Sequence, residues 1–143
     1  MILLDTSGLL SAIDVSQRHH RAARHALESA APPWILSPFV LAELDYLLAT
    51  RVNQAAERAL LDEVGRGVYR LESLDAGDIQ AAERVIARYR ELDIGLADAS
   101  IVVLAHRYGV RDVLTLDERH FRALRAAGGR PFRLHPADAP PAR

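Results

Sequence analysis

The sequence predicts a three-layer α/β domain, in which a short central parallel sheet is covered by helices on both faces. Short apolar runs alternate with longer helical segments along the chain, which favours parallel strands joined by crossover helices. The length of 143 residues fits one domain, and half of the residues are hydrophobic. We expect one domain over residues 1–135, followed by a mobile tail over 136–143 that is rich in proline and alanine.

The predicted strands are short and apolar. They span residues 1–4, 34–37, 68–71, 112–115 and 132–134. The run over 1–4 has no polar residue, as in a strand buried on both faces, whereas 68–71 alternates polar and apolar residues. In open sheets of this kind, ligands bind beyond the carboxyl ends of the strands.

The helices between the strands have recognisable start and stop signals. Thr6 or Ser7 can cap the first, and the second is expected to end before the prolines at 32 and 33. Pro38 begins the third, Asn53 caps the fourth, and Asp75 or Asp78 opens the fifth. The third and fourth helices are expected over 39–48 and 53–64. The fifth is a long helix that ends near residue 90, and the last two are expected over 96–108 and 118–126.

Two residue types are absent, and their absence excludes several chemistries. Without cysteine there is no disulfide, thiolate zinc site or thiol nucleophile. All 18 basic residues are arginine, so a P-loop lysine, a Schiff base and a lysine general base are excluded. The net charge of −1 means that a nucleic acid would have to meet a local arginine patch. No apolar stretch approaches the roughly 20 residues of a membrane span, and we expect a cytoplasmic protein.

Four carboxylates break the local pattern: Asp5, Glu43, Asp98 and Asp117. Asp5 and Asp117 follow predicted strands, and Glu43 and Asp98 fall on apolar stripes near the starts of their helices. Taken singly, the two strand-end residues could be caps or turn residues, and the two helical ones could be buried acids paired with arginine. Together they are predicted at one edge of the sheet.

Converging carboxylates need a cation or protons. Two of them about 4 Å apart repel by roughly 4 kcal/mol at an effective dielectric of 20. An all-oxygen ligand set without cysteine suits Mg²⁺, with Mn²⁺ as a substitute. The sequence therefore predicts a hard divalent metal site.

Four segments in this order resemble the PIN-domain ribonucleases, and within them the VapC-type toxins of bacterial toxin–antitoxin pairs. They are residues 2–10 (ILLDTSGLL), 37–43 (SPFVLAE), 95–101 (GLADASI) and 114–121 (LTLDERHF), and the resemblance extends over nearly the whole chain. It implies a PIN-like fold. It also implies that the four acids are the catalytic positions and that Thr6 or Ser7 is the hydroxyl beside the first. His120 stands where many relatives have a further acid or asparagine.

The chemistry of these residues suggests their roles. Asp5 and Asp98 would bridge a cation that activates water, while Glu43 and Asp117 would act through metal-bound waters or help to hold a second ion. The resemblance implies hydrolysis of RNA, such as a transfer or ribosomal RNA, to a 5′-phosphate and a 3′-hydroxyl. It further implies a small VapB-like antitoxin on the helices over 39–48 and 52–64, and a homodimer. Arg119 and Arg122 are the candidates for contact with the RNA backbone.

Other classes of protein share this order of strands and helices with acids at the strand ends. Phosphoryl-transfer receivers and aspartyl-phosphate phosphatases need a lysine, which this chain lacks. A catalytically silent module that holds a protein partner or RNA is the alternative, and the presence of all four acids argues against it.

Overall fold

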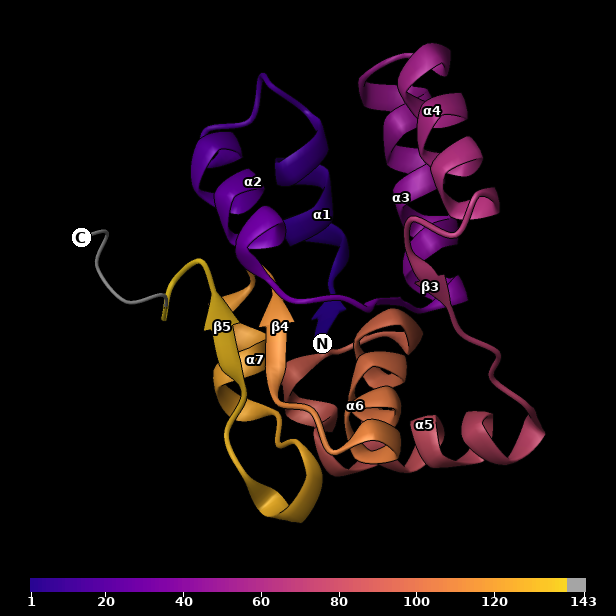
Figure 1. Ribbon diagram of the computed structural model, residues 1–143. Helices are drawn as coiled ribbons and strands as arrows, with labels where there is room; N and C mark the ends of the chain where they lie inside the picture. Colours follow the sequence, from indigo (N-terminus) through magenta and orange to yellow (C-terminus); the bar gives the residue numbers. More distant parts are fainter. Residues whose placement is uncertain (139–143) are drawn as a thin grey trace.

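A five-stranded parallel sheet forms the centre of the molecule (Figure 1). The computed structural model describes residues 1–138. The strands are β1 (Ile2–Leu4), β2 (Trp34–Leu36), β3 (Arg70–Leu71), β4 (Asp112–Leu114) and β5 (Arg133–His135). Their order across the sheet is β3-β2-β1-β4-β5. The predicted parallel α/β class is confirmed.

Seven α-helices cover the two faces of this sheet within residues 1–138. They are α1 (Thr6–Ile13), α2 (His20–Ser29), α3 (Pro38–Arg51), α4 (Gln54–Gly65), α5 (Ala76–Arg88), α6 (Leu96–Tyr108) and α7 (Glu118–Ala123). The chain steps from β1 to β3 in one direction and from β3 through β4 to β5 in the other. Right-handed crossovers therefore place α1–α4 on one side of the sheet and α5–α7 on the other, as Figure 1 shows.

The central strands are buried on both faces. Every residue of β1 is buried, as are Ile35 and Leu36 of β2 and Val113 and Leu114 of β4. Continuous apolar runs are what a parallel sheet between two helical layers requires. The edge strand β3 covers only two residues of the predicted 68–71, and both are exposed, so the alternation expected for that segment is not seen within the strand.

The strand order creates one preferred position for a ligand. Strand β1 is central, and the chain continues from it to β2 on one side and reaches β4 on the other only after crossing the sheet. The crevice beyond the carboxyl ends of β1 and β4 is thus the topological switch point of the sheet. The residues that directly follow these two strands are Asp5 and Thr115.

Three expectations about helix ends differ from the structure. The third helix runs to Arg51, three residues beyond its expected end at 48. The first helix has Asp5 at its N-cap position and no side-chain capping bond, because the Ser7 hydroxyl is used elsewhere. The last helix was expected to reach residue 126 but ends at Ala123. The Arg125 guanidinium donates hydrogen bonds to three carbonyl groups at this end, and extended backbone at Leu124 turns that side chain into the core.

The end of the described chain remains in contact with the domain. Asp138 accepts hydrogen bonds from the backbone N–H of Leu134 and from the Arg122 guanidinium. Residues 139–143 of the predicted tail lie outside the described residues. No helix in residues 1–138 has the length and apolar character needed to cross a bilayer.

Candidate active site

All four predicted acids line one cavity at the carboxyl ends of β1 and β4. Its volume is about 370 Å³, and Thr6 and Ser7 also line it. The acids come from four separate parts of the chain: the end of β1, the second turn of α3, the first turn of α6 and the start of α7. A larger hollow of about 600 Å³ lies beside α2 and contains none of them.

A buried pair of serine hydroxyls helps to bring α3 and α6 together. The Ser37 and Ser100 side-chain oxygens are 2.6 Å apart, and both residues are 1% exposed. Ser37 is the N-cap of α3 and accepts a hydrogen bond from Phe39, while Ser100 lies in the second turn of α6. This contact holds the starts of the two helices side by side, so Glu43 and Asp98 meet at one edge.

Asp5 is the most deeply buried of the four acids, with 5% of the residue exposed. Its Oδ2 accepts hydrogen bonds from the Thr115 hydroxyl at 2.6 Å and from the Ser7 hydroxyl at 2.7 Å. Burial raises the pKa of the Asp5 carboxyl, although these two hydrogen bonds oppose the shift and the charge of Asp117 adds to it. Ser7 also accepts from the Leu116 N–H, which connects the start of α1 to the segment after β4.

Asp98 lies in the first turn of α6 with 18% of its side chain exposed. Burial raises its pKa to about 6, and the charges of Asp5 and Asp117 act in the same direction. Glu43 differs from its predicted place on a buried stripe. It is exposed, because the buried face of α3 is formed by Val40, Leu44 and Leu48, and it reaches the cavity from the rim.

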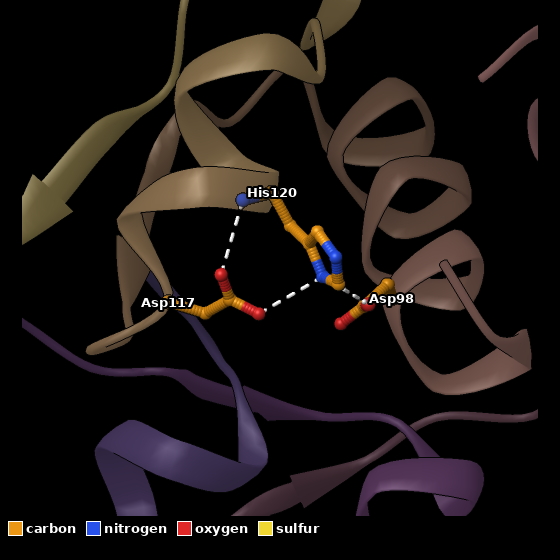
Figure 2. Close-up of side chains that lie close together, drawn as sticks. All are labelled: Asp98, Asp117 and His120. Carbon is orange, nitrogen blue, oxygen red and sulfur yellow. Dashed lines mark hydrogen bonds and ion pairs between the residues drawn. The ribbon is translucent and has the colours of Figure 1, made fainter. Parts of the chain in front are cut away.

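Asp117 is the fourth acid of the cavity, and His120 lies next to it (Figure 2). Asp117 is the N-cap of α7, where its Oδ1 accepts a hydrogen bond from the His120 N–H at 3.0 Å. The other carboxylate oxygen lies 2.9 Å from His120 Nδ1, which is also 3.1 Å from Asp98 Oδ2. The capping role and a role in the cavity are therefore compatible for Asp117.

The donor set fits a divalent cation. Burial raises the pKa of both the Asp5 and the Asp98 carboxyl groups, and the charge of Asp5 raises the pKa of Asp98 further. The Thr6 hydroxyl is buried at the same cavity and has no hydrogen-bond partner within residues 1–138. Asp98, Asp117 and His120 each offer one ligand atom, and these atoms lie within 4.8 Å of one another. A cation would compensate the charges of the carboxylates.

The predicted RNA-binding arginines do not line the cavity. Arg119 is exposed on α7, and the Arg122 guanidinium is engaged by both oxygens of Asp138 at 2.7 and 2.8 Å. Arg51, in the last turn of α3, does line it. Glu43, Leu47 and Arg51 are spaced by four residues and share one face of the helix, a signal that the sequence contains.

Comparison with known proteins agrees with this geometry. The family model described as "PIN domain" matches residues 2–126. The chain is 45% identical over 135 residues to ribonuclease VapC26 of Mycobacterium tuberculosis, covering 94% of this chain and all of that protein. The chain belongs to the PIN domain family. Within it, the chain is a VapC-type ribonuclease.

Solved structures share the PIN domain fold. Mycobacterium tuberculosis VapC20, described as a toxin that cleaves the sarcin–ricin loop, matches with a TM-score of 0.77 and 24% identity over 82% of this chain and 90% of that one. A toxin–antitoxin complex from Klebsiella pneumoniae matches with a TM-score of 0.66 and 19% identity over 87% and 92%. At these identities the two matches support the fold.

Proposed function

We propose that this PIN domain protein is the toxin of a type II toxin–antitoxin pair and cleaves RNA with the help of Mg²⁺ or Mn²⁺. The observation that carries the proposal is the convergence of Asp5, Glu43, Asp98 and Asp117 on one cavity at the switch point of the sheet. The relative VapC26 is named a ribonuclease, and VapC20 is described as acting on a ribosomal RNA loop. The products would be a 5′-phosphate and a 3′-hydroxyl.

Each acid has a part that follows from its position. Asp5 and Asp98, the two least exposed of the four acids, would hold the cation. Glu43 at the more open side would orient water, and Asp117 would orient water or join Asp98 as a ligand. A divalent cation bound there supplies Lewis-acid polarisation of a phosphate oxygen and lowers the pKa of water. Thr115 and Ser7 keep the Asp5 carboxylate fixed through their hydrogen bonds.

Arg51 would be the main residue that binds the phosphate groups of the RNA. It is the one arginine that lines the cavity among residues 1–138, and its guanidinium carries a permanent charge suited to a phosphodiester. Arg119 on exposed α7 would extend contact along the RNA backbone. Arg122 is already paired with Asp138 and would take part only if that pair opened.

The antitoxin would bind the helical pair α3 and α4. Tyr46 on α3 is 67% exposed and Leu61 on α4 is 43% exposed, so this pair presents apolar side chains to a partner. The structural match to a toxin–antitoxin complex supports a partner of this kind. A homodimer is also part of the proposal, and light scattering on the purified chain would test it.

The decisive experiment compares RNA cleavage by the wild-type protein and by Asp5→Asn. The asparagine oxygen can still accept from Thr115 and Ser7, so we expect a folded protein that has lost divalent-dependent cleavage. Asp62→Asn, in which an exposed acid on α4 is neutralised, is the matched control and should cleave normally. Sequencing of the cleaved ends would identify a transfer or ribosomal RNA target and the end chemistry. Cleavage by Asp5→Asn at the wild-type rate would contradict the proposal.

A further inference from the structure

His120 adds an imidazole nitrogen to the four carboxylates that line the cavity. Its Nδ1 lies 2.9 Å from Asp117 Oδ2 and 3.1 Å from Asp98 Oδ2 (Figure 2). Asp98 belongs to α6 whereas Asp117 and His120 belong to the start of α7, so the three side chains converge from two separate elements. His120 and Asp98 each have 18% of their side chains exposed. The imidazole is thus part of the wall of the cavity.

We infer that His120 Nδ1 is a direct ligand of the divalent cation and that this nitrogen makes the site prefer Mn²⁺ over Mg²⁺. The inference rests on the proposed function for the presence of a cation. It goes further in naming a ligand outside the four acids and the ion that this ligand selects.

The two separations measured from His120 Nδ1 match those between neighbouring ligands of one metal ion. For metal–ligand distances of about 2.1 Å, adjacent ligands of an octahedral ion are about 3 Å apart. The distances from His120 Nδ1 to the two carboxylate oxygens have this value. A cation could therefore replace the present contacts without displacement of the helices that carry them.

A second observation at the same cavity points to a bound group. Thr6 is 4% exposed, and its hydroxyl oxygen has no hydrogen-bond partner within residues 1–138. A buried hydroxyl without a partner is costly, and an ion with its water molecules would supply one. Thr6 and His120 both belong to the lining of the cavity, together with Asp5 and Asp98, so the residue with the unpaired hydroxyl and the residue with the nitrogen donor lie at the same site.

The preference for Mn²⁺ follows from ligand chemistry. Mg²⁺ is a hard ion that favours carboxylate, phosphate and water oxygens and gives up water reluctantly. Imidazole nitrogen is a better ligand for first-row transition ions, whose affinities rise from Mn²⁺ along the series. With an imidazole among the ligands, Mn²⁺ gains more than Mg²⁺, and we expect removal of the nitrogen to reduce the ratio of Mn²⁺ to Mg²⁺ affinity by about tenfold or more.

Pulsed electron paramagnetic resonance on the full chain loaded with Mn²⁺ tests the coordination directly. The wild-type protein should show coupling of the Mn²⁺ electron spin to a bound ¹⁴N nucleus, and His120→Gln should lose it. His19→Gln, which changes an exposed histidine at the start of α2, is the control and should retain it. Absence of ¹⁴N coupling in the wild-type spectrum would overturn the inference without the need for any variant.

Competition titrations test the selectivity. Mn²⁺ binding is measured with increasing Mg²⁺ for the wild type, His120→Gln and His19→Gln. An affinity ratio that is the same in all three proteins would refute the preference. Retained ¹⁴N coupling in a protein that does not cleave RNA would refute the proposed function alone, whereas Mn²⁺-dependent cleavage without ¹⁴N coupling would refute this inference alone.

Discussion

Asp98→Asn is expected to change the stability of the protein in opposite directions with and without a divalent cation. The substitution removes one negative charge, preserves the side-chain shape and leaves an oxygen that can accept from His120. In the metal-free protein, burial and the charges of Asp5 and Asp117 disfavour the Asp98 carboxylate. The neutral asparagine escapes this cost, so the variant should be more stable than the wild type when the cation is chelated.

The size and pH dependence of this effect follow from the pKa of Asp98. A rise from 3.8 to about 6 corresponds to about 3 kcal/mol as an upper limit when the carboxyl is ionised. Solvent access to the cavity reduces this to about 1–2 kcal/mol. Because the folded-state pKa is raised, the wild type loses this stability as the pH rises from 3.8 and the loss is complete above about 6. The advantage of the variant should be full at pH 8 and should disappear near pH 4.

Addition of the cation should reverse the order of stability. A ligand that binds only the folded state adds about 3 kcal/mol at about 100 times its Kd. The wild type should gain this stabilisation, and the variant, which lacks an anionic ligand, should gain little.

Urea unfolding at pH 4 and pH 8 with chelator, and at pH 8 also with saturating Mn²⁺, measures all of these changes. Asp138→Asn is the control. Its carboxylate is paired with Arg122, which lowers the pKa of Asp138 to about 2, so this variant should lose stability at neutral pH whether or not the cation is present. The reasoning fails if Asp98→Asn is less stable than the wild type in chelator at pH 8, or if the cation stabilises both proteins equally.

Two further predictions concern the position of α1 and the capture of phosphate. In Gly8→Ala, the added Cβ would lie 2.8 Å from the backbone N of Thr115 and still closer to the Leu114 carbonyl group. We therefore expect the free energy of unfolding, measured with urea, to fall by about 3 kcal/mol. Gly65→Ala meets no atom within 4 Å and should leave stability unchanged or slightly raised, and equal effects of the two substitutions would contradict the packing argument. Arg51→Gln should raise KM for RNA about tenfold and weaken the salt dependence of cleavage, whereas Arg84→Gln on exposed α5 should not. An unchanged KM in the Arg51 variant would exclude this contact.

The strand and helix pattern could be predicted because it depends on local signals. Apolar runs identified the strands, and Pro38 and Asn53 marked helix starts that the structure confirms. The last helix was predicted too long because its end depends on the Arg125 side chain and on burial of Leu124, which are contacts made only in the folded chain. Glu43 was placed on a buried stripe because neighbouring apolar residues do not specify which face of α3 meets the core.

The sequence alone determined the kinds of chemistry that this protein can perform. The absence of lysine and cysteine and the four unusual acids fixed an oxygen-rich site suited to a divalent cation. Only the tertiary structure decided which side chains share the cavity: Arg51 lies there and Arg122 is held by Asp138, while His120 lies between Asp98 and Asp117. The physical reason is that residue type sets charge and ligand character, whereas distances between remote residues are set by the strand order and by the packing of α3, α6 and α7 at the end of the sheet.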